Sequence, residues 1–213
     1  MKLIRKILTA FKRKKNHDLL GDILNSLLKG DWAVGLDDLQ VLEQELHRFI
    51  QYPKINVLEF GTGASSLFFL KYFTENNISY QLDIVEEDVK WITVIKNHLR
   101  KIKIANHLNF YQISYNQSTG LDEAALNLFK NNDYEIVFID APPDTSVVNG
   151  RYKLAKIILN KIKPNGILII HDSKRNMEMF AVEKLKPQFL NYKNVNTAKG
   201  LTIFYFPKDI NNE

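Results

Sequence analysis

Short apolar segments alternate with amphipathic ones from residue 55 onward, and this alternation limits the fold more than any other feature of the chain. The apolar segments span residues 55–60, 80–85, 108–113, 134–139 and 166–170. Their length and their polar boundaries predict buried strands, and the segments between them predict helices. Those helices run to about residue 76, to about residue 101, and over residues 121–130, 150–162 and 176–185. Such alternation is typical of an α/β fold, a mostly parallel sheet with helices on both faces.

Two further strands are predicted near residues 189–195 and 201–206, joined through the short connection Lys199-Gly200. A connection of this length favours a hairpin. We therefore expect an antiparallel strand at one end of the sheet.

Three parts are predicted along the chain: a basic tail over residues 1–17, helices over 18–54 and the main domain over 55–207. The tail carries seven Lys or Arg residues and no acid, so the other residues hold 22 basic (29 minus 7) and 24 acidic side chains. The formal charge of +5 therefore belongs to the tail, and nucleic acid is not an expected partner. Ile4, Ile7, Leu8 and Phe11 have the spacing of one helical face. This spacing predicts a basic amphipathic helix. Its expected contact is either an anionic membrane surface, through residues 1–15, or its own domain or a partner, and a frayed terminus is the remaining alternative.

The expected location is cytoplasmic. The first fifteen residues contain no uncharged run long enough for a signal peptide, and no later apolar run approaches the roughly 20 residues that span a bilayer. Cysteine is absent, which excludes disulfides and thiolate sites. We expect a cytoplasmic protein, either soluble or peripheral at the inner membrane surface, of an oligomeric state that the sequence leaves open.

A glycine turn follows the first predicted strand, in Glu59-Phe60-Gly61-Thr62-Gly63. Ligands of open α/β sheets bind at the carboxyl ends of the strands, and glycines let the backbone approach a ligand closely. Ser66 stands where a dinucleotide fingerprint has its third glycine or alanine. The turn therefore favours a nucleoside ligand without a pyrophosphate over a nicotinamide dinucleotide.

The second predicted strand ends in Glu86-Glu87-Asp88. An acid at this place can accept hydrogen bonds from both ribose hydroxyls of a nucleoside. Glu86 is favoured by its spacing from the glycine turn, and strand alternation predicts that only one of Glu86 and Glu87 faces the cleft. Asp88 is explained by capping of the next helix.

Four features together resemble the class I S-adenosylmethionine-dependent methyltransferases: Glu59 to Gly63, the acidic end at Glu86, the strand ending in Asp140, and the Lys163–Ile170 turn into the fifth strand. The resemblance covers residues 55–206. It implies the strand order 3-2-1-4-5-7-6 with the seventh strand antiparallel, and S-adenosylmethionine as cofactor. The residues that it implies for cofactor binding are Glu59, Gly61, Gly63, Ser65, Ser66, Glu86, Glu87 and Asp140.

A narrower resemblance is to the plant xylan-biosynthesis family that includes glucuronoxylan 4-O-methyltransferases. It is carried by Gly61-x-Gly63-x-x-Ser66-Leu67, Glu86-Glu87-Asp88, Tyr111-x-x-x-Tyr115-Asn116, Asp140-x-Pro142, Gly150-Arg151 and His171-Asp172-x-x-Arg175. This resemblance implies O-methylation of a hydroxyl of a sugar or polysaccharide. Tyr115, Arg151 and Arg175 are the expected substrate contacts, and the two arginines would suit an anionic acceptor such as a uronic acid.

A hydroxyl acceptor gains from a general base within hydrogen-bonding distance. Asp140 and the His171-Asp172 pair end strands that the family order makes neighbours, about 4.8 Å apart. We expect His171 or Asp140 to be the base, with the other and Asp172 orienting it. Alternation allows His171 and Asp172 to face the acceptor together only if the strand has already ended.

The same residues leave other functions open. Asp140 and Asp172 resemble two magnesium ligands of catechol-type O-methyltransferases, with Ser173 where those enzymes have asparagine. A metal-dependent small-molecule O-methyltransferase is therefore one alternative, and a non-catalytic cofactor-binding module at a membrane is another. Asp140-Ala141-Pro142-Pro143 also resembles the loop of adenine N-methylases, without the aromatic residue. In purely structural roles, Asp140 and Asp172 would cap helices, and Arg151 and Arg175 would pair with them.

Overall fold

The computed structural model describes residues 21–28, 34–102, 107–121, 123–128, 133–142 and 147–207. The basic tail over residues 1–17 lies outside this part of the chain. Its helix and its membrane contact therefore stay predictions, as do the three domain boundaries. Within the described ranges, no helix combines the length and apolarity that crossing a membrane requires.

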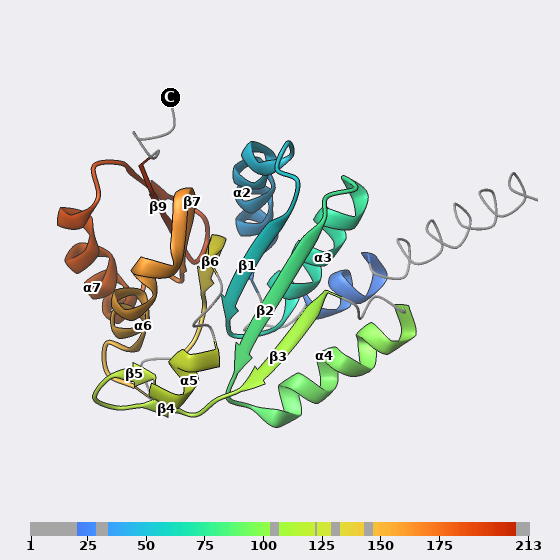
Figure 1. The fold of residues 1–213 in the computed structure, drawn as a ribbon, viewed down its shortest axis with the longest axis horizontal. Coiled ribbons are helices and arrows are strands. Elements are labelled where there is room, and N and C mark those ends of the chain that lie inside the picture. The colour runs from blue at the N-terminus through green and yellow to red at the C-terminus, as the bar shows by residue number, and fades with distance from the viewer. Residues whose placement is uncertain are drawn as a thin grey trace, which may run out of the picture.

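A seven-stranded sheet forms the centre of the molecule (Figure 1). Its strands are β1 (Ile55–Phe60), β2 (Tyr80–Glu86), β3 (Leu108–Gln112), β6 (Tyr134–Ile139), β7 (Ile162–His171), β8 (Tyr192–Val195) and β9 (Leu201–Tyr205). They lie side by side in the order β3-β2-β1-β6-β7-β9-β8. β9 runs antiparallel to the other strands of this sheet, which are all parallel to one another. Since β6 to β9 are the fourth to seventh strands, the predicted order 3-2-1-4-5-7-6 is confirmed.

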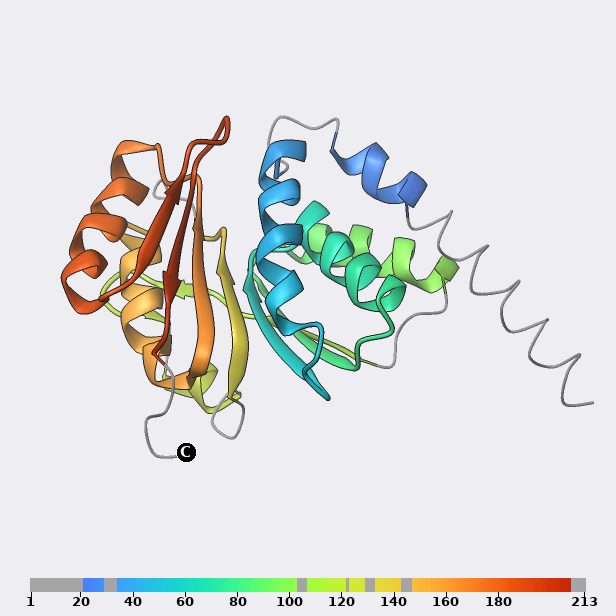
Figure 2. The same ribbon diagram turned by 90° about the horizontal axis from the view of Figure 1, so that it is seen from above.

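Helices cover both faces of the sheet (Figure 2). One face packs against α2 (Leu36–Leu46), α3 (Ala64–Glu75) and α4 (Val89–Ile102), and the other against α5 (Glu123–Leu128), α6 (Gly150–Ile158) and α7 (Asn176–Leu185). Single-turn helices η1 (His47–Phe49), η2 (Leu159–Lys161) and η3 (Lys186–Gln188) follow α2, α6 and α7. Residues 21–27 are also helical and pack on the α2 side.

The central strands are mostly apolar because both of their faces are buried. In β7, Ile167 and Ile169 join the core under α2 and α3, while Leu168 and Ile170 join the core under α6 and α7. This alternation continues to the end of the strand, and it turns His171 toward the α2 side.

Two details differ from the expected elements. Strand β7 begins at Ile162, four residues before the predicted start, because Ile162 pairs with Tyr134 ahead of a register shift. A second, two-stranded sheet of β4 (Tyr115–Asn116) and β5 (Gly120–Leu121) was not predicted, since strands of two residues show no periodicity.

Candidate functional site

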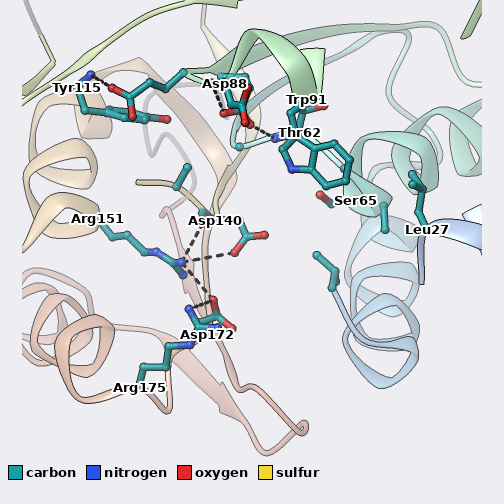
Figure 3. A pocket seen from close by; sticks show the side chains of 17 residues that line it. Leu27, Thr62, Ser65, Asp88, Trp91, Tyr115, Asp140, Arg151, Asp172 and Arg175 are labelled. Carbon is teal, nitrogen blue, oxygen red and sulfur yellow. Dashed lines mark hydrogen bonds and ion pairs between the residues drawn. The ribbon is translucent and has the colours of Figure 1, made fainter. Parts of the chain in front are cut away.

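A cavity of about 450 Å³ opens at the carboxyl ends of β1, β2 and β6, where the parallel strands of the sheet end together (Figure 3). Its size is that of a small-molecule site. It is lined by Leu27, Val34, Gly61, Thr62, Gly63, Ala64, Ser65, Glu86, Glu87, Asp88, Trp91, Tyr115, Asp140, Ala141, Arg151, Asp172 and Arg175.

The glycine turn after β1 forms the floor of this cavity. Gly61 has a φ of +94°, and a side chain there would meet the Cβ of Ala141 at 3.3 Å. At Gly63 an added Cβ would find nothing within 4 Å, so the backbone there is open to a ligand. The turn therefore needs glycine at residue 61 for its conformation and offers open backbone at residue 63.

Glu59 supports the turn from below. Its side chain is fully buried, and its two carboxylate oxygens accept hydrogen bonds from the hydroxyls of Ser65 at 2.5 Å and Ser66 at 2.6 Å. Ser65 lines the cavity, whereas Glu59 and Ser66 do not. The two residues that were expected to touch the cofactor thus hold the first turn of α3 against the end of β1 instead.

Burial, reinforced by the charges of Asp140 and Glu86, raises the pKa of Glu59 from 4.5 to about 8, although the serine hydroxyls oppose this shift. A raised pKa in the folded state means that stability is fully present below pH 4.5 and is lost as the pH rises toward 8. Glu59→Gln cannot ionise at this position, so we expect the variant to keep its stability as the pH rises. Its free energy of unfolding at pH 9 should exceed that of the wild type by up to about 5 kcal/mol. Urea unfolding between pH 5 and pH 9 measures the difference. The control is Glu75→Gln, at the exposed end of α3, and parallel profiles for wild type and Glu59→Gln would contradict the prediction.

Acidic side chains form the wall at the end of β2. Glu86 is 8% exposed, and its carboxylate accepts hydrogen bonds from the backbone N–H groups of Thr62 at 3.0 Å and Asp88 at 2.9 Å. Burial raises the pKa of Glu86 despite these donors. Glu87 also lines the cavity and accepts a hydrogen bond from the Tyr115 backbone at 3.3 Å. Both glutamates face the cavity because β2 ends at Glu86, which corrects the expectation that alternation would admit only one.

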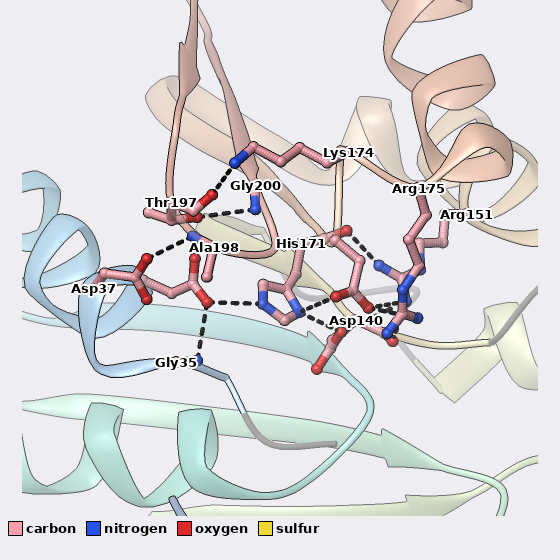
Figure 4. A network of polar contacts seen from close by, with 12 residues as sticks. Gly35, Asp37, Asp140, Arg151, His171, Lys174, Arg175, Thr197, Ala198 and Gly200 are labelled. Carbon is pink, nitrogen blue, oxygen red and sulfur yellow. Dashed lines mark hydrogen bonds and ion pairs between the residues drawn. The ribbon is translucent and has the colours of Figure 1, made fainter. Parts of the chain in front are cut away.

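His171 lies at the end of β7 and is almost completely buried (Figure 4). Its Nδ1 lies 2.7 Å from Asp140 Oδ1, its Nε2 lies 3.1 Å from Asp38 Oδ2, and its ring stacks on Phe138. Burial alone would lower the pKa of His171, but Asp140, Asp38 and the charge of Asp172 raise it to about 9. The ring is therefore an imidazolium at neutral pH that donates both N–H groups, and it is not part of the cavity wall.

Asp140 differs from His171 in having a free atom. Its Oδ1 is held by His171, but within the described part of the chain no hydrogen bond is made by its Oδ2, and its side chain is 22% exposed in the cavity. Burial would raise the pKa of Asp140, yet the positive charges of His171 and Arg151 outweigh it and lower the pKa. Asp140 is consequently an ionised carboxylate with one oxygen facing the cavity, and this geometry favours it over His171 as the base.

Arg151 of α6 is buried behind the strand ends. Its Nη1 donates to the His171 carbonyl, and its Nη2 donates to the Asp140 carbonyl at 2.8 Å and to Asp172 Oδ2 at 3.2 Å. The Nη2 also lies 3.5 Å from Asp140 Oδ1 and 3.5 Å from Glu178 Oε1. Both terminal nitrogens of the guanidinium are thus held by the protein itself. Arg151 nevertheless lines the cavity, and its Nε has no hydrogen-bond partner among the described residues, so its contact with an acceptor stays a prediction beside this structural role.

Asp172 and Arg175 complete the site beside Arg151. Asp172 follows the last residue of β7 with a φ of +57°, so the strand has ended and its side chain can line the cavity although His171 points away. A left-handed conformation is uncommon outside glycine and is typical of functional sites. Arg175 pairs with Asp172 Oδ2 at 2.9 Å and is 44% exposed, so its guanidinium remains accessible from the cavity.

A divalent cation does not fit these residues. Ligand atoms of Asp140, His171 and Asp172 lie within 4.8 Å of one another. However, both ring nitrogens of His171 are already bound to carboxylates, and the Arg151 guanidinium lies between Asp140 and Asp172. The place of a metal ion is therefore taken by an arginine cation.

Two residues of the site could not be identified in the sequence. Trp91, in the first turn of α4, lines the cavity with an indole that is 40% exposed. The sequence feature that could have indicated Trp91 is an aromatic residue shortly after the acidic end of the second strand, Glu86-Glu87-Asp88. Asp38 contacts His171 across 133 positions of sequence, and nothing local marks it.

Comparisons with known proteins agree with this architecture. A family model described as a methyltransferase domain matches residues 58–173, more than half of the chain. No curated protein sequence matches. Among solved structures, a Podospora anserina methyltransferase with S-adenosylhomocysteine bound is 14% identical, with a TM-score of 0.65 over 97% of this chain and 96% of that one.

Two other solved structures are O-methyltransferases by name. A Staphylococcus aureus protein assigned as a caffeoyl-CoA O-methyltransferase is 18% identical, with a TM-score of 0.64 over 96% of this chain and 99% of that one. The Streptomyces achromogenes O-methyltransferase TomG, involved in tomaymycin synthesis and complexed with S-adenosylmethionine, is 14% identical, with a TM-score of 0.60 over 92% and 89%. At these identities the likeness shows a shared fold.

Proposed function

Because the chain belongs to the methyltransferase-domain family that matches residues 58–173, we propose that it transfers a methyl group from S-adenosylmethionine to a hydroxyl oxygen of a sugar acceptor. Family membership confirms the predicted methyltransferase class. The observation that carries the proposed chemistry is the Oδ2 of Asp140 in the cavity, which has no hydrogen-bond partner among the residues that the structure describes and lies at the same cavity as the open backbone of Gly63.

The residues of the cavity fit S-adenosylmethionine, which when bound supplies an electrophilic methyl group on a sulfonium. Gly61 and Gly63 leave room for the ligand against the backbone, and Glu86 has the carboxylate that ribose hydroxyls require. Trp91 offers an aromatic face for a purine base. The acids around the cavity favour a ligand that carries positive charge.

Asp140 is proposed as the general base. Its Oδ2 would accept the proton of the acceptor hydroxyl as the oxygen forms its bond to the methyl carbon, while the carbon–sulfur bond breaks and its electron pair leaves with S-adenosylhomocysteine. His171 and Arg151 hold the rest of this carboxylate in place. Since their charges lower its pKa, Asp140 is a weak base, and alignment of the acceptor supplies the larger share of catalysis.

Polar groups at the far end of the cavity support a sugar acceptor. Asp172 and the accessible Arg175 can bind hydroxyls or a carboxylate, as a uronic acid would offer. The hydroxyl of Tyr115, also at the cavity, is buried and has no hydrogen-bond partner among the described residues, and burial raises its pKa well above 10. A bound ligand would satisfy this neutral phenol.

Calorimetry with S-adenosylmethionine tests the cofactor site. We expect Glu86→Gln to weaken binding by about 10- to 100-fold, because a charge-assisted hydrogen bond contributes roughly 1.5–3 kcal/mol. Glu87→Gln is the matched control and is expected to change the affinity by less than about threefold, since its exposed carboxylate is already well hydrated. Absence of binding by the wild type at millimolar ligand would overturn the proposed function, and equal losses in both variants would overturn the role of Glu86.

Transfer of labelled methyl groups tests the acceptor. The panel would contain a glucuronic acid-substituted xylan oligosaccharide, its unsubstituted counterpart and catechol. Labelling of the oligosaccharides supports a sugar acceptor. If only catechol is labelled, the sugar acceptor is rejected in favour of a small aromatic acceptor. If the cofactor binds but no compound is labelled, a non-catalytic module is favoured.

A further inference from the structure

Asp38 is a buried carboxylate that the proposed chemistry does not use directly. It lies in the first turn of α2, its exposed fraction is 0%, and its Oδ2 accepts hydrogen bonds from Gly35 N at 2.9 Å and His171 Nε2 at 3.1 Å. Its other oxygen, Oδ1, is buried and makes no hydrogen bond of ordinary geometry within the described ranges, although the nearby Thr197 hydroxyl also interacts with this carboxylate. Burying a charge is costly unless it is paired, and the contact with the His171 imidazolium is the largest of those that compensate its burial, ahead of the hydrogen bonds from Thr197 and Gly35.

A helix cap alone does not explain this position. An acid in the first turn can cap a helix while its side chain stays in water, as Asp37 next to it does in part: Asp37 Oδ2 accepts a hydrogen bond from Ala198 N at 2.6 Å at the exposed surface. Asp37 thus attaches α2 to the β8–β9 hairpin without touching His171. Asp38 points inward from the same turn and reaches the end of β7.

Asp38, His171 and Asp140 form one continuous chain of hydrogen bonds. It begins in α2, crosses the buried imidazole and ends at the Oδ1 of Asp140, whose Oδ2 has no partner in the described part of the chain. Because both ring nitrogens are bound to carboxylates, neither rotation nor flipping of the ring is possible without losing a charge-assisted hydrogen bond. The orientation of His171, and with it that of Asp140, is therefore fixed from α2.

We propose that Asp38 is a positioning residue for methyl transfer, which orients His171 and through it presents Asp140 Oδ2 to the acceptor hydroxyl. This inference rests on the proposed function. The N-terminal segment then contributes to catalysis itself and does not only cover the sheet.

Several charged groups surround His171 and enter any measurement of its titration. Asp38 faces it from α2, Asp140 from the end of β6 and Asp172 from the residue after β7. Arg151 of α6 binds its carbonyl, and Lys199 of the hairpin acts on Asp140. Of these groups, only Asp38 is substituted in the test.

The test compares Asp38→Asn with Asp37→Asn in the full chain. Asp38→Asn is expected to lower kcat by about 10- to 100-fold on the best acceptor of the panel, with the affinity for S-adenosylmethionine changed less than about twofold. Asp37→Asn is expected to change kcat by less than about threefold, since it removes a contact of α2 but not the one to His171. Asp38→Glu is expected to recover part of kcat. Similar losses of kcat in Asp38→Asn and Asp37→Asn would overturn the proposal, because docking of α2 would then be the cause.

Nuclear magnetic resonance of the His171 ring provides a readout that needs no acceptor. Its titration midpoint is expected to fall by about one pH unit or more in Asp38→Asn and to stay unchanged in Asp37→Asn. A midpoint that does not move in Asp38→Asn overturns the proposal whether or not the wild type transfers methyl groups. A midpoint that moves in a protein that transfers none would support the contact and reject the proposed function, so the two failures are distinguishable.

Discussion

Asp140→Asn is expected to lower kcat for methyl transfer by about 10²- to 10⁴-fold, the range that a general base contributes. The substitution keeps the size of the side chain and can keep a hydrogen bond to His171, but it removes the carboxylate oxygen that would accept the hydroxyl proton. Single-turnover kinetics with labelled S-adenosylmethionine measure the chemical step. Because the pKa of Asp140 is lowered, the wild-type rate should not fall on acidification until the pH is below about 4.

The control for Asp140 is another acid of the same cavity. Asp88 lines it and caps α4 through the N–H of Lys90 at 2.7 Å, so Asp88→Asn keeps most of the cap and is expected to change kcat by less than about threefold. A rate in Asp140→Asn within tenfold of the wild type would contradict the role of Asp140, provided that cofactor affinity is retained.

Arg151→Met is expected to destabilise the fold by about 3–5 kcal/mol, the cost of removing one partner from a buried ion pair. Asp140, Asp172 and Glu178 converge on the Nη2 of Arg151, and Asp172 and Glu178 are almost fully buried, so their charges would lose this partner. For a chain of this length the loss corresponds to a decrease in Tm of roughly 6–20 °C. Differential scanning calorimetry at pH 7 measures it.

Arg175 is the matched control because it pairs with the same Asp172 oxygen from the surface. Exposed ion pairs contribute about 0–1 kcal/mol, so Arg175→Met should lower the Tm by less than about 4 °C. Equal effects of the two substitutions would contradict the assignment of Arg151 to structural support.

The fold was predictable because each central strand is buried on both faces. Such strands consist of continuous apolar residues, as in Ile136 to Ile139, and they stand out from the amphipathic helices between them. Strand ends are equally visible, since the apolar run stops at the first residue that reaches the cavity. Asp140 and Asp172 were found in this way, and both line the cavity.

The roles of these residues were harder to predict than their places. The buried position of His171 is explained by its contact with Asp38, on the α2 side of the sheet. Asp38 lies 133 positions away in the sequence, so this contact leaves no local signal. Likewise, the sequence indicates that Arg151 is near the strand ends, but only the packing of α6 and α7 shows that three carboxylates surround it. Long-range pairs of this kind leave no local periodicity.

The place of β9 in the sheet determines the order in which the site is assembled during synthesis. β9 is made after β8 yet lies between β7 and β8, so β8 has no hydrogen-bonded neighbour until β9 has emerged. Proteins begin to fold from the N-terminal side as they are synthesised. The half of the cavity formed by β1, β2 and β6 can therefore close first, while the hairpin contacts that hold α2, such as the one from Asp37 to Ala198, form only at the end. In a nascent chain the strand ends that carry Gly61, Glu86 and Asp140 would thus come together before the hairpin contacts that hold α2.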